Sequence, residues 1–133
     1  MAKFNKTEHV AVLVQSASQN RIKIGRVTNL DGKIIKGVRM ITPNESTNDP
    51  LGRATVSATV FKKAFLSLET MNGKEEISLL PLTALAQEYN NGDVPEFTDK
   101  LINFENSYIT IGETTGLTAG TVFQMLVAYE DKK

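Results

Sequence analysis

The sequence AFLSLETMNGKEEISLL, residues 64–80, places the dipeptide Asn72-Gly73 between two runs rich in apolar residues. Asn-Gly is favoured in two-residue hairpin turns, because both central residues of such a turn take a positive φ. The flanking ranges, 64–71 and 74–80, have the length and composition of strands. This stretch predicts an antiparallel β-hairpin and sets the fold class for the rest of the chain.

The chain before this hairpin has the same period-two pattern, which is typical of strands that bury one face. The expected elements are strands over 9–15, 21–28 and 33–42, a polar loop over 43–53, and a strand of small residues over 54–60. Asp31-Gly32 predicts a hairpin turn between the second and third of these strands. A slip in the alternation after Gly25 predicts a bulge there.

The chain after the hairpin continues in the same way. The expected elements are a short helix or turn over 82–89, a loop over 90–100, one interrupted strand or two short ones over 101–104 and 107–111, a loop rich in Gly and Thr over 112–120, and an apolar strand over 121–129. About eight strands separated by turn residues indicate an all-β fold, a single antiparallel β-sandwich that is jelly-roll-like. A five-stranded OB-type barrel is the alternative architecture.

Length and composition indicate one globular domain. The chain has 133 residues, of which 41% are hydrophobic and 23% charged, and it has no Cys. We expect a single β-sandwich domain over 1–133, with a short N-terminal arm over 1–8 and a charged tail over 130–133. Without disulfides, its stability must come from core packing and from neighbouring subunits.

Neither a membrane span nor a secretory signal is predicted. A spanning helix needs about 20 apolar residues, and no window of the chain reaches that length. Charged side chains at Lys3, Lys6 and Glu8, followed by His9, interrupt the N-terminus where a signal peptide would be apolar. The expectation is a soluble chain made in the cytoplasm.

The sequence carries no recognisable catalytic motif. It lacks the phosphate-loop, Rossmann and Gly-x-Ser-x-Gly patterns, and His9 is its single histidine. Glu75 and Glu76 are adjacent on a strand and point to opposite faces, so they cannot converge on one bond. The oxygen-rich loop 44–49 lacks the spacing of a calcium loop. We expect no enzyme, no catalytic, cofactor-binding or metal-binding residue, and no small-molecule substrate.

The net charge is zero, but the two halves of the chain differ. Residues 1–63 hold eleven Lys and Arg against four Asp and Glu, a net charge of +7, so residues 64–133 carry −7. If the halves interdigitate in one sandwich, these charges largely cancel within the monomer. If they segregate to opposite flanks, copies could dock by complementary potentials.

Six cations lie on the two predicted strands around Asp31-Gly32: Arg21, Lys23, Arg26, Lys33, Lys36 and Arg39. Paired as a hairpin, the two strands would form one basic ribbon able to contact phosphates or another partner. Residues 21–42 contain no Phe, Tyr or Trp, so the ribbon lacks the stacking platform of single-strand readers. A nucleic-acid-binding β-barrel that uses these strands is the alternative function.

Four segments of the second half resemble a known family: Phe61-Lys62-Lys63-Ala64-Phe65-Leu66-Ser67-Leu68, Asn72-Gly73-Lys74-Glu75, Leu80-Pro81-Leu82-Thr83-Ala84-Leu85 and Asn106-Ser107-Tyr108-Ile109-Thr110-Ile111. Together they are similar to single jelly-roll virion proteins of tailless icosahedral bacteriophages. The resemblance covers roughly residues 61–129. It implies a self-assembling capsid, penton (vertex) or spike-base subunit that packs around a symmetry axis in the virion.

The expected function is therefore that of a virion structural protein, a vertex or minor capsid component. Its partners would be its own copies, other capsid proteins and the packaged nucleic acid. The resemblance transfers no functional residue. A carbohydrate-binding or receptor-binding module is a third class, for which Tyr89 and Phe97 are the aromatic candidates in the long loops.

Overall fold

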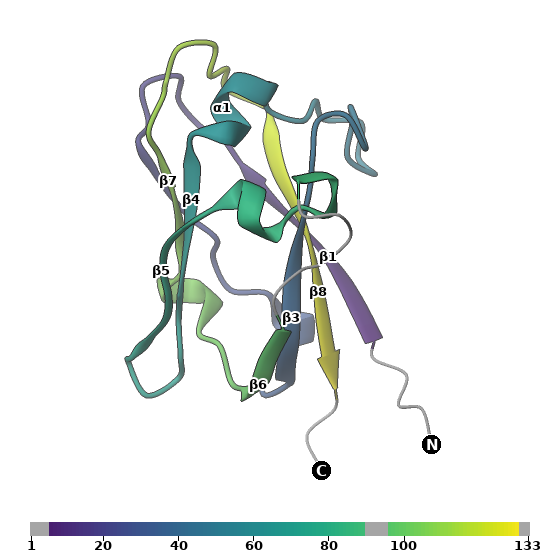
Figure 1. Cartoon of the computed structure of the whole chain (residues 1–133), viewed down its shortest axis with the longest axis vertical. Helices are drawn as coiled ribbons and strands as arrows, with labels where there is room; N and C mark the ends of the chain where they lie inside the picture. The colour runs from purple at the N-terminus through teal and green to yellow at the C-terminus, as the bar shows by residue number, and fades with distance from the viewer. Residues whose placement is uncertain (1–5, 90–95, 131–133) are drawn as a thin grey trace.

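The computed structural model of the chain describes residues 6–89 and 96–130, and these residues form two antiparallel four-stranded sheets. Sheet A contains, in spatial order, β1 (Lys6–Leu13), β8 (Val122–Glu130), β3 (Ile34–Ile41) and β6 (Glu96–Lys100). Sheet B contains β2 (Arg21–Lys23), β7 (Tyr108–Ile111), β4 (Ala64–Glu69) and β5 (Glu75–Pro81). Sheet B lies at the left of Figure 1 and sheet A at the right, so that the two sheets make a sandwich.

The strand pairs are nested. β1 pairs with β8, β2 with β7, β3 with β6, and β4 with β5, all antiparallel. The further pairs β3–β8 and β4–β7 complete the two sheets. Eight strands arranged in this way form a jelly roll. The predicted all-β antiparallel sandwich is confirmed, and the five-stranded barrel is excluded.

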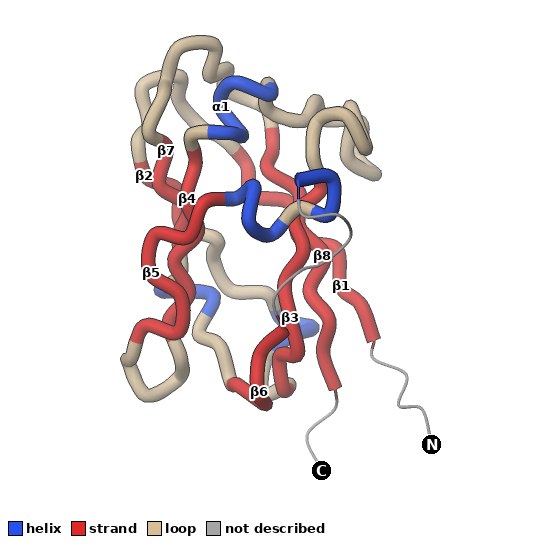
Figure 2. Tube along the Cα trace, viewed as in Figure 1, coloured by secondary structure: helices blue, strands red, loops and turns tan. Residues whose placement is uncertain are grey.

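Short helices lie in the connections between strands, where Figure 2 draws them in blue. They are the 3-10 helices η1 (Thr28–Leu30), η2 (Leu82–Leu85), η3 (Gln87–Tyr89) and η4 (Phe104–Asn106), and the α-helix α1 (Ala58–Lys62). The prediction of a short helix or turn over 82–89 is confirmed. Helix α1 replaces the strand predicted over 54–60, and that prediction is wrong.

Helix α1 is anchored in the core by its last turn. Val60 and Phe61 lie in the helix and are buried, while Val56, just before the N-cap, is buried from extended chain. Ser57 precedes the helix, and its Oγ accepts a hydrogen bond from the Val60 N–H at 3.3 Å. A capping serine of this kind stabilises a helix start.

The hairpin predicted at Asp31-Gly32 does not exist. β2 ends at Lys23, and the chain then crosses from sheet B to sheet A, where β3 begins. Gly25 has a φ of +83° but lies in this crossing, so it marks no bulge within a strand. Leu30 is 3% exposed in the crossing and packs in the core. Burial of this leucine draws the connection across the end of the sandwich, which a two-residue turn would not allow.

The hairpin predicted at Asn72-Gly73 is confirmed as β4 and β5, but its turn spans residues 70–74, and of Asn72 and Gly73 only the glycine takes a positive φ. Gly73 has a φ of +82°, and the Thr70 N–H donates to the Lys74 carbonyl at 2.7 Å. The strands predicted over 9–15, 33–42 and 121–129 correspond to β1, β3 and β8, and the later part of the predicted 101–111 region to β7.

Two boundaries differ from the prediction. Within the loop predicted over 90–100, residues 96–100 form β6, which pairs with β3, while residues 90–95 lie outside the described residues. The expected N-terminal arm over 1–8 is too long, because β1 begins at Lys6. In both places, the strand gains its hydrogen bonds from a distant partner that local periodicity does not reveal.

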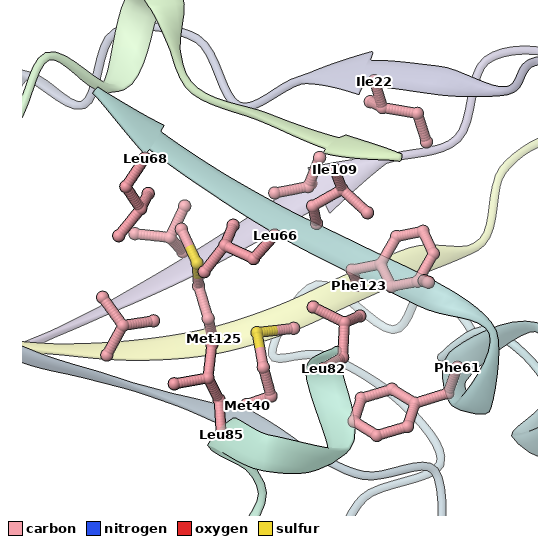
Figure 3. Packing of buried hydrophobic residues seen from close by; sticks show 14 of the residues in the cluster. Ile22, Met40, Phe61, Leu66, Leu68, Leu82, Leu85, Ile109, Phe123 and Met125 are labelled. Carbon is pink, nitrogen blue, oxygen red and sulfur yellow. The ribbon is translucent and has the colours of Figure 1, made fainter. Parts of the chain in front are cut away.

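The core lies between the two sheets, and Figure 3 shows its packing. Sheet B contributes Ile22 and Leu66, and sheet A contributes Phe123, all 4% exposed or less. Leu82 from η2 and Phe61 from α1 close the core from the side, both nearly inaccessible to solvent. The connections therefore supply core residues, and they are part of the folded unit.

We predict that Leu66→Ala lowers the free energy of unfolding by about 2–5 kcal/mol, because a fully buried leucine leaves a cavity when it is truncated. Leu51→Ala is the matched control: this leucine is 77% exposed, and its truncation should change stability by less than about 0.5 kcal/mol. Urea unfolding followed by circular dichroism measures both. Equal effects of the two substitutions would contradict the described core.

Candidate functional site

The six cations predicted to form one basic ribbon are separated by the fold. Arg21 and Lys23 lie on β2 in sheet B, while Lys36 and Arg39 lie on β3 in sheet A. The remaining two, Arg26 and Lys33, lie in the crossing between the sheets. The prediction of a single basic ribbon is therefore wrong, because it required β2 and β3 to pair as a hairpin.

Several of these cations contact groups of the protein itself. Arg26 pairs with Asp31 at 2.7 Å, Lys36 with Glu130 at 3.5 Å, and Arg39 with Glu45 at 2.9 Å. The hydrogen bond from Arg26 to Asp31 also raises the pKa of this guanidinium above its ordinary value. The Arg21 guanidinium lies over the Tyr108 ring, 4.0 Å from its centroid. These contacts reduce the positive potential that the six residues could offer to phosphates, and nucleic-acid contact stays a prediction.

The charge asymmetry between the two halves of the chain does not become an asymmetry between layers. β1 and β3 from the basic half alternate in sheet A with β8 and β6 from the acidic half, and sheet B likewise combines β2 with three later strands. The ion pairs Lys36–Glu130 and Lys63–Glu113, at 3.5 Å and 3.9 Å, join the halves directly. The halves interdigitate, which is the first of the two arrangements that the sequence left open.

The structure contains a cleft of about 460 Å³. Three connections line it: the crossing from β2 to β3, the β4–β5 turn and the segment between β6 and β7. The lining residues are Arg26, Val27, Asp31, Gly32, Lys33, Met71, Leu101, Ile102, Asn103, Phe104 and Glu105. Two of the six predicted contact residues therefore lie together in this cleft.

The cleft combines apolar walls with a charged rim. Ile102 and Phe104 belong to the core, at 6% and 4% exposure, whereas Met71 is 61% exposed. The segments are tied together by the hydrogen bond from the Met71 N–H to the Leu101 carbonyl at 2.9 Å. The ion pair between Arg26 and Asp31 forms part of the rim. This combination suits an apolar side chain of a partner whose neighbouring groups are polar.

Sequence reasoning missed the cleft, because its residues come from three connections that are far apart in the chain. The one local signal was an apolar residue, Met71, directly before the Asn72-Gly73 turn, where a polar residue is usual.

The single histidine forms part of a polar network on sheet A. The His9 Nε2 lies 2.8 Å from Gln124 Oε1, and Gln124 Nε2 donates to Thr55 Oγ1 at 2.6 Å. Gln124 is 2% exposed, so these bonds satisfy the polar atoms of a buried side chain. The network links β1, β8 and the chain just before α1.

The loop considered for calcium directs its carboxylates toward the protein. Glu45 accepts a hydrogen bond from the Thr42 N–H at 3.1 Å and pairs with Arg39. Asp49, whose side chain is 1% exposed, accepts from the backbone N–H groups of Leu51 and Arg53 at 3.1 Å and 2.7 Å. Among the side chains that the structure describes, no three His, Asp or Glu gather in a way that could hold a metal ion.

The Asp49 contacts hold Leu51 outward. The Arg53 guanidinium also pairs with the Asp49 carboxylate at 2.7 Å, so both ends of the turn 49–53 are fixed on one side chain. Leu51, at the tip of this turn, is 77% exposed. An apolar side chain in a fixed, exposed position is a candidate contact for another subunit.

Comparisons with known proteins add no relative: no family model, no curated protein and no solved structure matches the chain. Within residues 6–89 and 96–130, no helix has the length and apolar character needed to cross a membrane.

We predict that Asp49→Asn lowers the melting temperature at neutral pH and that this difference shrinks in acid. Burial raises the pKa of the Asp49 carboxyl, but the hydrogen bonds and the charge of Arg53 outweigh burial and bring the pKa below its ordinary value. A lowered folded-state pKa stabilises the fold above the unfolded value, about 3.9, and this contribution is lost as the pH falls through the folded-state pKa.

Melting curves of the wild type and of Asp49→Asn between pH 7 and pH 2.5 test this prediction. Asp31→Asn is the control, because Asp31 pairs with Arg26 on the surface, where an ion pair adds little stability. A difference between wild type and Asp49→Asn that stays constant into acid would contradict the described turn.

Proposed function

We propose that this chain is a virion structural protein, a self-assembling jelly-roll capsid subunit at a vertex (penton) or in a minor capsid position. The observation that carries the proposal is the nested strand order of the two sheets. Viral capsid domains commonly use this arrangement, although lectins and cupins use it as well. In this proposal, the chain is made in the host cytoplasm and acts in the virion, where it contacts its own copies, other capsid proteins and packaged nucleic acid.

The resemblance to phage virion proteins gains support from where its segments lie. The segments 61–68, 72–75, 80–85 and 106–111 are separated in the sequence, yet they include β4, the turn to β5, the end of β5 and β7. These three strands are neighbours in sheet B. A resemblance spread over adjacent strands of one sheet is what a shared structural layer would produce.

Exposed apolar residues give such a subunit places to meet its neighbours. Leu51, Met71 and Leu79 are 77%, 61% and 52% exposed, and they lie in the loop before α1, at the β4–β5 turn and on β5. Leu79 also has a φ of +49°, a left-handed conformation that leucine rarely adopts. Strained or fixed positions that expose an apolar side chain fit a contact with another protein chain.

We predict that the purified chain forms an assembly whose mass is a defined multiple of the monomer and which persists at high salt. Static light scattering at 50 mM and 500 mM salt, with and without a short single-stranded oligonucleotide, gives the absolute mass. Subunit interfaces with an apolar centre tolerate salt, whereas binding to phosphates weakens linearly in the logarithm of the salt concentration.

A monomer that gains mass only with the oligonucleotide, and loses it in high salt, would contradict the capsid proposal and favour nucleic-acid binding. Lys23→Gln would then test the alternative function, because Lys23 is an exposed member of the six cations. If binding occurs at these residues, this substitution should weaken it and reduce the salt slope by about one.

A further inference from the structure

The outer edge of β1 carries a row of peptide groups that point away from the sheet. The Val14 N–H donates to the Thr121 carbonyl at 2.8 Å, while the Val122 N–H, on the opposite side of β8, donates to the Ala54 carbonyl at 2.9 Å. In an antiparallel ladder, successive residues direct their peptide groups to alternate sides. Even-numbered residues of β1 therefore bond to β8, and odd-numbered residues point outward: Thr7, His9, Ala11 and Leu13.

Within the part of the chain that the structure describes, nothing pairs with this edge. Among residues 6–89 and 96–130, no strand or bridge is formed on the outer side of β1, and no backbone hydrogen bond from these residues reaches the peptide groups of Thr7, His9, Ala11 or Leu13. In Figure 1, the beginning of β1 lies at the right-hand border of sheet A, beyond β8. An unpaired row of N–H and C=O groups is a template for another strand.

The other three edge strands are protected against such pairing. β2 has three residues, of which two are cations. β5 is interrupted by register shifts and ends in Pro81, and β6 has five residues and meets a register shift in β3. β1, in contrast, pairs with β8 over eight consecutive residues without a register shift. It contains no proline, and residues 9–13 include no Lys, Arg, Asp or Glu. Short length, bulges, charged residues and proline usually protect an edge strand from pairing with another chain, and β1 has few of these features.

We infer that β1 pairs with β1 of a second copy of this chain, antiparallel about a two-fold axis, and so joins two copies of sheet A into one eight-stranded sheet. A row of alternating N–H and C=O groups is complemented by an extended strand. Two copies of the same edge complement each other when a two-fold axis relates them. That axis, perpendicular to the sheet, makes the two β1 strands antiparallel, as all neighbouring strands of sheet A are.

The length of β1 and its side chains together select the register: centred on Val10, residues 7–13 all pair within the strand, whereas centred on Ala11 only 9–13 do. With Val10 on the axis, outward-pointing residues face outward-pointing residues, and Thr7 lies opposite Leu13 of the second copy. Glu8 then faces Val12, and His9 faces Ala11, so no two like charges lie opposite each other. A register centred on His9 would instead place the two imidazoles directly opposite each other, although each already hydrogen-bonds Gln124 of its own chain.

This inference rests on the proposed function only in that the chain meets its own copies. A two-fold joint through β1 can exist in a free dimer, or it can connect subunits within a larger closed shell. The experiments below therefore give separate results for the joint and for the larger assembly.

We predict that Ala11→Lys reduces the mass of the assembly at least twofold, because it places a charge in the joint beside His9 of the second copy. Ala11→Pro should have the same effect, since it removes an outward N–H, and proline is tolerated on an edge strand when its N–H would face outward. Ala17→Lys, in the exposed loop after β1, is the matched control and should retain the wild-type mass. Light scattering gives the mass, and circular dichroism melts verify that every variant is folded.

Cross-linking tests the register, because the chain has no Cys of its own and an introduced pair is unambiguous. A mixture of the Thr7→Cys and Leu13→Cys proteins should form a disulfide-linked heterodimer under mild oxidation. Each variant alone should form far less, because its two cysteines would lie about 20 Å apart across the axis.

The outcomes separate the two proposals. A folded Ala11→Lys protein with wild-type mass, together with no heterodimer in the mixture, overturns the β1 joint and leaves a larger assembly intact. A wild type that is only a dimer, and that Ala11→Lys converts to a monomer, supports the joint and counts against a ring or shell. A wild type that is monomeric at all concentrations overturns both.

Discussion

The fold depends on the last strand entering sheet A between two early strands. β8 pairs with β1 on one side and β3 on the other, and Phe123, Met125 and Val127 of β8 enter the core. Gln124 of the same strand connects to His9 and Thr55 through hydrogen bonds. Until β8 is in place, neither β1 nor β3 has its central partner. The β1–β8 pairs join residues more than a hundred positions apart, and the β3–β8 pairs join residues more than eighty apart. Such pairing is costly in chain entropy and slow to form, but once formed it fixes both halves of the chain in one unit.

The features predicted correctly from the sequence are those that local chemistry decides. Gly73 supplies the positive φ that the turn between β4 and β5 needs, and the period-two runs of β1, β3 and β8 identify strands with a buried face. The errors arise where tertiary burial outweighs local pattern. Asp31-Gly32 resembles a hairpin turn, but Leu30 beside it is buried in the core, and the chain crosses to the other sheet. The run 54–60 alternates like a strand, yet Ser57 caps a helix that begins at Ala58 and buries Val60 and Phe61.

The candidate site was harder to predict than the fold, because it depends on strand order. The six cations form one ribbon only if β2 and β3 are neighbours, and the nested topology places these strands in different sheets. Glu130, the ion-pair partner of Lys36, is distant in sequence and could not be inferred from spacing, whereas Asp31 and Glu45 are near neighbours of Arg26 and Arg39 in the chain. The same topology creates two surface features: a cleft built from three separate connections, and the edge at β1 that we propose as a joint between copies. In this account, the nested order of strands is the cause of both the fold and the contacts it offers.

The most direct test of that order is the set of cross-strand contacts between backbone protons in solution NMR. In an antiparallel ladder, Hα protons approach closely at the pairs that exchange no hydrogen bonds. The account predicts strong Hα–Hα contacts between His9 and Leu126 and between Met40 and Met125, on the two sides of β8. Contacts that instead link residues 22–24 with 39–41, as a hairpin at Asp31-Gly32 would produce, would contradict it.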